Sequence, residues 1–171
     1  GRALKDASMK LRSDKDVVMA AVTQDGSVLE YCSDVLQSDR EVVLAAISND
    51  VCSILYASAE LRGDKEIMLM VVRKHGFLLW RASDELRATK EVVIEAVHDK
   101  GLALEYASDV LKDDRDVVIE AVTRHGYALE FASQELRADK YVVEQAVAND
   151  PFAFTLASKK IRGNKDLTLK V

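Results

Sequence analysis

The sequence contains few residues of the kinds that build disulfide frameworks, irregular loops or membrane spans. It has two cysteines and one proline in 171 residues, so it implies no disulfide framework, and we expect a reducing, intracellular compartment. No stretch approaches the roughly 20 consecutive apolar residues that a membrane helix needs, and the N-terminus shows no signal-peptide pattern. The net charge of -5 is modest, which disfavours broad attraction to nucleic acid or anionic membranes.

A 25-residue pattern recurs along the whole chain without insertion or deletion. A fixed period of this length is the sequence signature of a solenoid, in which each repeat packs mainly on its neighbours. We therefore predict one array over residues 1–171, with positions numbered 1 to 25 within each repeat. The complete repeats are 1–25, 26–50, 51–75, 76–100, 101–125 and 126–150, and a partial seventh is 151–171.

Two helices are expected in each repeat. Apolar residues at positions 4, 7 and 11 share one face of a first helix, and those at positions 17, 18, 21 and 22 share one face of a second. Asp, Asn or Thr at position 14 is typical of a helix N-cap. Glycine at position 1 is interpreted as a left-handed C-cap, and Pro151 as a first-turn residue. The predicted fold is all-α, a solenoid of two-helix repeats, with a turn of tighter helix inside the first helix as an alternative.

The repeated pattern Gly-x-Ala-Leu-x-Tyr-Ala-Ser-x-x-Leu, seen from residue 101 onward and echoed in every repeat, resembles the tandem repeat family catalogued as domain of unknown function 4116. The resemblance covers the whole chain, and there is a looser similarity to leucine-rich repeat variant solenoids. It implies a helical scaffold that usually belongs to a longer array. The family has no established activity, so the resemblance assigns no functional residues.

Residues with reactive side chains recur in every repeat instead of forming one distinct site. Serine at position 8 occurs seven times, whereas a catalytic nucleophile needs one activated copy. We interpret it as structural, with the hydroxyl bonded to a helix carbonyl. His75, His98 and His125 have no Cys or carboxylate partner at metal-ligand spacing. The chain is therefore predicted to be non-catalytic and to bind neither a metal nor a cofactor.

Basic residues form two columns, at positions 12 and 15. The formal charge over positions 12 to 16 nevertheless sums to only +1 across all seven repeats, which argues against nucleic acid as a partner. Ion pairs between repeats, using the acidic residue at position 16, are the favoured interpretation. An anion- or nucleic-acid-binding solenoid that uses these columns is the alternative. The column at position 15 is Lys15, Arg40, Lys65, Lys90, Arg115, Lys140 and Lys165.

Apolar residues replace polar ones at several positions near the middle of the chain. Position 5 is Glu in three repeats but holds Leu55 and Trp80, and Met70 lies at position 20, which is Glu95, Glu120, Gln145 and Lys170 in the later repeats. Position 2 changes from Arg2 and Ser27 to apolar residues, including Phe77. We predict a partner-binding patch at Leu55, Met70, Phe77 and Trp80. Local repacking is the alternative.

Neither end of the sequence has the polar repeat that caps most solenoids. Leu4 and Leu11 in the first repeat, and Leu167, Leu169 and Val171 in the last, should present apolar surface. We therefore expect a protein-protein interaction scaffold that is a fragment of a longer array or a structural subunit of a larger assembly. End-to-end stacking with further repeats or with another subunit is expected to cover these ends.

Overall fold

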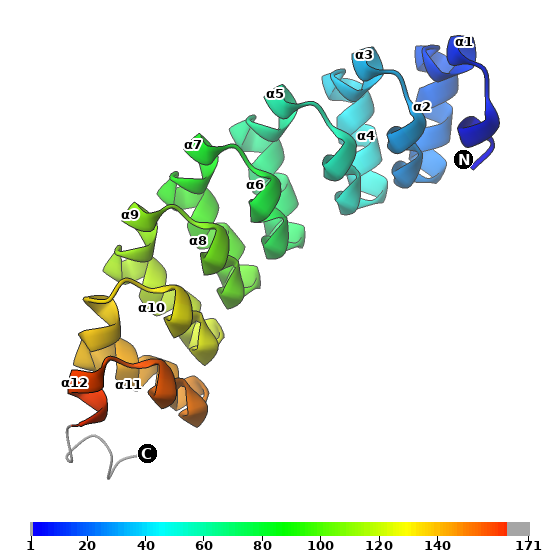
Figure 1. Cartoon of the computed structure of the whole chain (residues 1–171). Coiled ribbons are helices and arrows are strands. Elements are labelled where there is room, and N and C mark those ends of the chain that lie inside the picture. The colour runs from blue at the N-terminus through cyan, green and yellow to red at the C-terminus, as the bar shows by residue number, and fades with distance from the viewer. Residues whose placement is uncertain (1, 164–171) are drawn as a thin grey trace. The chain divides into compact units, whose positions relative to one another are not determined.

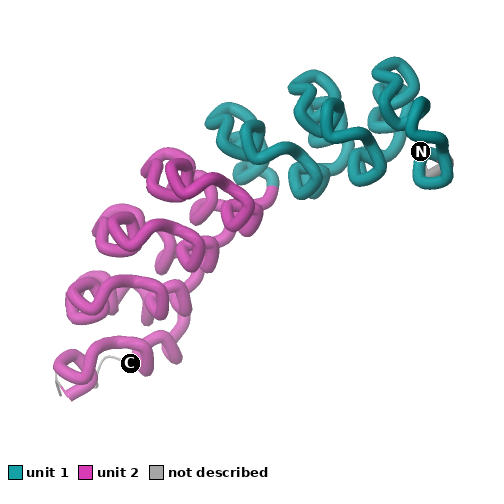
Figure 2. The backbone as a smooth tube through the Cα atoms, turned by 45° about the horizontal axis from the view of Figure 1, so that its top comes forward, with its two compact units in different colours: residues 1–74 teal, residues 75–171 magenta. Residues whose placement is uncertain are grey.

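The computed structural model describes residues 2–163, and helices with short connections account for this whole range. Each of the first six repeats contributes a 3-10 helix within positions 1 to 6, a short helix within positions 9 to 13 and a long α-helix from position 15 (Figure 1). The described part of the seventh repeat contains the first two of these helices. No strand occurs within the described range. The chain divides into two compact units, residues 1–74 and residues 75–171 (Figure 2). The all-α repeat fold is confirmed.

The helices repeat in the same order along the chain. The 3-10 helices are η1 (Arg2–Asp6), η2 (Gly26–Tyr31), η3 (Val51–Tyr56), η4 (Gly76–Arg81), η5 (Gly101–Tyr106), η6 (Gly126–Phe131) and η8 (Pro151–Leu156). The short helices are α1 (Met9–Arg12), α3 (Asp34–Gln37), α5 (Ala59–Arg62), α7 (Asp84–Arg87), α9 (Asp109–Lys112), η7 (Leu136–Ala138) and α12 (Lys159–Arg162). The long helices are α2 (Lys15–Gln24), α4 (Arg40–Asn49), α6 (Lys65–Lys74), α8 (Lys90–Asp99), α10 (Arg115–Arg124) and α11 (Lys140–Asn149).

The long helices begin where the sequence predicts. The Asp114 carboxylate accepts hydrogen bonds from the N–H groups of Asp116 and Val117, at 3.1 and 3.2 Å, and therefore satisfies two backbone donors that the first turn leaves open. Asp14, Asp39 and Asp139 cap their helices in the same way. The equivalent Asn164 lies outside the described residues. The apolar face made by positions 17, 18, 21 and 22 of the long helices is buried in α4, α6, α8 and α10.

The predicted first helix is divided into a 3-10 helix and a short helix. The alternative of a tighter turn is therefore correct for its first half. The backbone becomes extended between the two, as at Ala57 (ψ 152°) and Ser58 (ψ 158°). The serine at position 8 then caps the short helix in four repeats, as where Ser83 Oγ accepts the N–H of Leu86 at 3.3 Å. The expected bond from these hydroxyls to a helix carbonyl is wrong for Ser83, because the serine stands before a helix and not inside one. It is also wrong for Ser133, whose hydroxyl donates to the carboxylate of Asp113.

The glycine column has a different role from the one that the sequence predicted. No glycine among the described residues has a positive φ, so the left-handed C-cap is wrong. A β-carbon at Gly126 would lie 2.5 Å from the carbonyl oxygen of Ala146. Gly26 and Gly101 meet Ala46 and Ala121 in the same way. Glycine therefore allows each 3-10 helix to lie directly against the long helix of its own repeat. Pro151 does open its 3-10 helix, as expected.

Backbone hydrogen bonds join neighbouring repeats. The N–H of the serine at position 8 donates to the carbonyl oxygen at position 12 of the preceding repeat, for example from Ser33 to Arg12 at 3.0 Å. Within the second unit, Ser108 bonds to Arg87 and Ser133 to Lys112, each at 2.9 Å. These bonds hold consecutive repeats in register independently of their side chains. Over the described residues, no helix is both long enough and apolar enough to cross a membrane.

Candidate interaction surfaces

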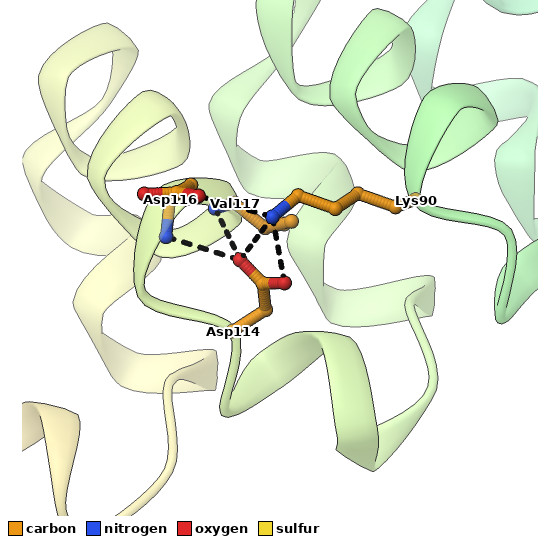
Figure 3. Close-up of polar contacts among 4 residues, drawn as sticks. All are labelled: Lys90, Asp114, Asp116 and Val117. Atoms are coloured by element: carbon orange, nitrogen blue, oxygen red, sulfur yellow. Dashed lines mark hydrogen bonds and ion pairs between the residues drawn. The ribbon is translucent and has the colours of Figure 1, made fainter.

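The basic column at position 15 forms ion pairs between repeats. Lys90 on α8 reaches the cap of α10, where its ammonium lies 2.8 Å from Asp114 Oδ2 and 3.1 Å from Asp116 Oδ2 (Figure 3). In the first unit, Lys15 lies 2.8 Å from Asp39 and 2.9 Å from Glu41. The predicted pairing with position 16 is therefore confirmed for these two lysines. The cap residue at position 14 is a second partner that the sequence analysis did not identify.

Arginines in this column bind the next repeat in the same way. Arg40 Nη2 lies 2.7 Å from Glu66 Oε2, and Arg115 Nε lies 3.1 Å from Asp139 Oδ2. The guanidinium of Arg115 also lies over the ring of Tyr141, 5.1 Å from its centre. Tyr141 stands where other repeats have an acidic residue, so a cation-π contact replaces an ion pair there. These four cations are thus already engaged by neighbouring repeats.

The ion pairs shift the pKa values of both partners. The hydrogen bond to Asp39 raises the pKa of Lys15, and the same bond lowers the pKa of Asp39. The hydrogen bond to Asp114 likewise raises the pKa of Lys90. For Asp114, burial acts in the opposite direction, but the bonds from Lys90 and from the Val117 N–H outweigh it and lower the pKa. Both partners therefore stay charged through the neutral pH range.

Three residues at position 12 bind backbone carbonyls near the ends of the 3-10 helices. Arg12 Nε donates to the carbonyl of Ala7 at 3.1 Å, and Gln37 Nε2 donates to that of Leu29 at 3.0 Å. Arg137 Nε donates at 2.8 Å to the carbonyl of Leu156, in the following repeat. These bonds satisfy carbonyl groups that a short 3-10 helix leaves open. Arg12 and Arg137 of the basic column at position 12 are therefore engaged in hydrogen bonds within the array.

A further link between repeats involves asparagine at position 24, which the sequence analysis overlooked. The Oδ1 of Asn149 accepts the N–H of Gly126 at 2.7 Å, while its Nδ2 donates to the carbonyl of Thr123 at 3.0 Å. Asn49 makes the same two contacts, with Gly26 and Thr23. Asparagine supplies both a donor and an acceptor, so it can bridge two repeats. The sequence signal for this bridge was the recurrence of asparagine at position 24, in Asn49 and Asn149, two residues before the next repeat begins.

The four residues of the predicted patch are divided between the two units. Leu55 is half-buried on η3 and Met70 is 38% exposed on α6, both in the first unit. Phe77 is half-buried and Trp80 is 47% exposed, both on η4 in the second unit. Arg81 stacks on the indole of Trp80, with 4.6 Å from its guanidinium carbon to the ring centre. The structure therefore brings Phe77 and Trp80 together on one short helix.

An apolar stripe continues from Phe77 through the second unit. Position 2 of the four 3-10 helices in this unit carries large apolar side chains, and each helix packs against the next. Tyr127 is 39% exposed and Phe152 is 71% exposed. We call this set, together with Trp80, the apolar stripe: Phe77, Trp80, Leu102, Tyr127 and Phe152. Position 2 in the first unit is instead Arg2, Ser27 and Cys52.

Acidic side chains accompany the apolar stripe. Residues three apart in a 3-10 helix lie on the same side, because this helix has three residues per turn. Glu105 on η5 therefore lies beside Leu102, and Glu130 on η6 lies beside Tyr127. Both glutamates are exposed. The stripe thus offers apolar contacts with two negative charges beside its middle two helices, η5 and η6.

Two hollows lie between short helices of neighbouring repeats. One of about 350 Å³ is lined by Asp84, Arg87, Tyr106 and Ser108, and another of about 420 Å³ is lined by Arg137, Lys159 and Arg162 among others. They occupy equivalent places, one between the fourth and fifth repeats and the other between the sixth and seventh. Across residues 2–163, no group of three or more His, Cys, Asp or Glu side chains is placed to hold a metal ion.

His98 forms an exposed hydrogen-bonded pair with Glu120 of the next repeat. Its Nδ1 lies 2.9 Å from Glu120 Oε1 on α10, and Glu120 also accepts a hydrogen bond from Arg124 at 3.0 Å. Burial would raise the pKa of Glu120, but these two partners lower it. The contact joins two repeats, as the ion pairs at position 15 do. It therefore adds to the links between α8 and α10.

The profile of one protein family matches the chain repeatedly. It is described as domain of unknown function (DUF4116), and it matches residues 1–37, 14–62, 39–87, 64–109 and 89–137. Successive matches overlap, and from the second match onward they begin 25 residues apart, which is the repeat period. No curated protein and no solved structure gives a significant match to the chain.

Proposed function

Since the chain belongs to the DUF4116 family, whose function is unknown, we propose from the geometry that it is a non-catalytic scaffold that binds a protein partner through the apolar stripe. The observation that carries this proposal is the row of large apolar side chains on adjacent 3-10 helices, with Trp80, Tyr127 and Phe152 exposed. Exposed aromatic residues grouped on a rigid surface are typical of sites that dominate interface energy.

The partner that fits this surface is a protein segment with apolar and basic residues. Its apolar side chains would cover the stripe, while its Lys or Arg residues would face Glu105 and Glu130. Adjacent helices pack about 8 to 10 Å apart, and a polyproline II segment advances about 3.1 Å per residue with three residues per turn. A segment in this conformation would therefore present an apolar side chain to the stripe at every third position.

The remaining charged columns support this choice of surface. Lys90 and Arg115 are held by carboxylates of the next repeat, and Arg137 by a backbone carbonyl. A phosphate-binding track would have to compete with these contacts. The two cysteines, Cys32 and Cys52, are free thiols, in keeping with the intracellular location that we propose. Burial raises the pKa of Cys32 to about 11, so its thiol is poorly reactive.

Affinity measurements on stripe variants test the proposal. Partners are first captured on the immobilised chain from its native source, and each purified partner is then titrated by calorimetry. We expect Trp80→Ala and Tyr127→Ser each to weaken binding by about tenfold or more, since central aromatic residues often contribute over 1 kcal/mol to an interface. Tyr141→Ala is the matched control, because Tyr141 is also an exposed aromatic residue but lies on α11.

Circular dichroism and thermal melting first establish that each variant keeps the wild-type fold. A partner that binds all three folded variants with wild-type affinity would show that the apolar stripe is not the binding surface. Replacing Glu105 and Glu130 with Gln tests the charge part separately. It should weaken binding most at low salt, because exposed charge pairs are screened by ions.

A further inference from the structure

A row of basic residues follows the apolar stripe on the side opposite to Glu105 and Glu130. These residues stand at position 25, directly before η4, η5 and η6 of the second unit. We call them the basic edge: His75, Lys100 and His125. The same position is acidic before η2, η3 and η8, where it is Asp25, Asp50 and Asp150. The basic edge therefore accompanies the stripe only along its first three helices.

Contacts within the second unit place the basic edge beside the stripe. The ring of His75 lies against that of Phe77, with 6.3 Å between their centres. A β-carbon on Gly101 would lie 2.9 Å from the β-carbon of His125, so His125 stands next to the start of η5 as well as that of η6. Lys100 and His125 are exposed, and His75 is half-buried. The basic edge thus borders the stripe and is open to solvent at two of its three residues.

The charge of the basic edge is not used within the array. Among the residues that the structure describes, neither Lys100 nor His125 forms an ion pair. Asp99, which precedes Lys100, instead accepts the N–H of Gly76 at 2.8 Å. An imidazole offers an N–H donor when neutral and a positive charge when protonated. The basic edge can therefore receive acidic groups of a partner, whereas the basic column at position 15 is held by carboxylates of the next repeat.

Two neighbouring 3-10 helices present the same order of charge. Along the axis of η5 come Lys100, Leu102 and Glu105, and η6 packs directly against η5. The equivalents on η6 are His125, Tyr127 and Glu130. A 3-10 helix rises about 2.0 Å per residue, so the two flanks lie roughly 10 Å apart. The apolar stripe consequently runs between a basic flank and an acidic flank.

A polyproline II helix has the symmetry that fits such a surface. Each of its three faces recurs every third residue, or about 9 Å, which matches the spacing of about 8 to 10 Å between packed helices. When one face lies on the stripe, the other two point toward the two flanks. Four of the five side chains of the stripe are aromatic, and preformed polyproline II segments dock on aromatic surfaces with little loss of entropy.

We infer that the apolar stripe binds a proline-rich segment of the partner, with proline at every third position over the aromatic side chains. Acidic residues of the segment face the basic edge, and its Lys or Arg residues face Glu105 and Glu130. This inference rests on the proposed function and specifies the partner's sequence. Opposite charges on the two outer faces also exclude segments that carry one sign of charge throughout, because one flank would then meet a like charge.

Two synthetic peptides of identical composition test the order of charge. The first contains four copies of Pro-Glu-Lys, which place all acids on one face of a polyproline II helix and all lysines on another. The second alternates Pro-Glu-Lys with Pro-Lys-Glu, which mixes both charges on each face. Calorimetric titration of the full chain at low salt should show that the first peptide binds about fivefold or more tightly, and added salt should reduce the difference. Equal affinities, or no binding of either peptide, would overturn the inference.

A charge-swapped chain provides the second test. The double variant Lys100→Glu with Glu105→Lys reverses the order of charge on η5 alone, so it should prefer the alternating peptide. Glu85→Lys is the control, because Glu85 is exposed on α7 of the same unit, and it should keep the wild-type preference. Circular dichroism first establishes that each variant is folded. A swapped chain with the wild-type preference would contradict the assigned flanks.

Tyr127→Ser separates this inference from the proposed function. It should weaken binding of the first peptide, because it removes an aromatic ring from the stripe. If Tyr127→Ser weakens both peptides while the wild type binds them equally, the stripe binds as proposed and only the order of charge is wrong. The titrations of captured partners test the stripe independently of either peptide.

Discussion

The carbonyl oxygen of Ala146 lies 2.5 Å from the point that a β-carbon on Gly126 would occupy. This distance is too short for any carbon atom at that point, so the 3-10 helix η6 can approach α11 only because residue 126 has no side chain. The backbone at this glycine has a negative φ. The requirement is thus for space and not for an unusual conformation.

Replacement of Gly126 by Ala should consequently destabilise the chain. The added methyl group must displace η6 from α11, and overpacking of this kind costs about 1 to 3 kcal/mol. Gly163→Ala is the matched control, since a β-carbon there would lie 3.4 Å from its nearest neighbour, the carbonyl of Lys159. Denaturant unfolding of both variants measures the difference. Equal free energies of unfolding for the two would contradict the role assigned to Gly126.

The cap and the ion pair at Asp114 can be separated by two substitutions. Asp114→Ala removes the acceptor for the N–H groups of Asp116 and Val117, and we expect a loss of about 1 kcal/mol. Asp114→Asn keeps an acceptor oxygen and loses only the charge that faces Lys90, so its loss should be smaller. Urea denaturation at neutral pH gives both values. Should Asn prove as costly as Ala, the ion pair rather than the cap would be the main contribution.

The bridge made by Asn149 predicts a graded series. Asn149→Ala leaves the N–H of Gly126 and the carbonyl of Thr123 without this partner, which should cost about 1 to 3 kcal/mol. Asn149→Asp should cost less, because a carboxylate still accepts the glycine N–H, as Asp99 does for Gly76 at 2.8 Å. Thermal unfolding ranks the variants, and hydrogen exchange reports the amide of Gly126 directly. Unchanged protection of this amide in Asn149→Ala would show that the bridge does not hold it.

Stability should fall in acid. The hydrogen bonds at Asp39, Asp114 and Asp139 lower the pKa of each carboxyl below the ordinary value of 3.8. The unfolded chain therefore binds more protons than the folded chain in this range, so the free energy of unfolding decreases as pH drops below about 4. Unfolding by urea at a series of pH values measures the slope. Asp114→Asn should have a shallower slope than the wild type, and an identical slope would argue against this assignment.

The repeat period and the long helices follow from the sequence because they depend on local chemistry. Asp114 caps a helix through contacts with Asp116 and Val117, which are its near neighbours in the chain. The pairing of Lys90 with Asp116 follows from the period, since equivalent positions of adjacent repeats lie side by side. These features required no knowledge of the three-dimensional packing.

The first helix of each repeat was harder to predict. Apolar residues three and four apart fit both an α-helix and a 3-10 helix that leads into a short α-helix. Acidic residues after serine, as in Ser83-Asp84-Glu85, are typical of a helix start and were the overlooked signal. Ser83 Oγ does accept the N–H of Leu86, at 3.3 Å.

The role of glycine at position 1 depends on a helix about 20 residues later in the sequence, so local reasoning could not establish it. Val51 and Pro151 at the same position were nevertheless informative. A β-branched residue rarely adopts a positive φ, and proline cannot adopt one. Likewise, the candidate patch could not be assembled from sequence, because whether Leu55 and Trp80 lie in one compact unit is a property of the packing.

The backbone bond from the serine N–H to the preceding repeat has an evolutionary consequence. Its donor and acceptor, as in Ser133 and Lys112, are groups that any residue other than proline can supply. Whole segments of 25 residues could therefore be duplicated, lost or exchanged by recombination without disturbing the junctions. A change in length between a donor and its acceptor would instead disturb the junction that this bond joins. This constraint accounts for an array that has diverged in sequence while keeping every repeat boundary in phase.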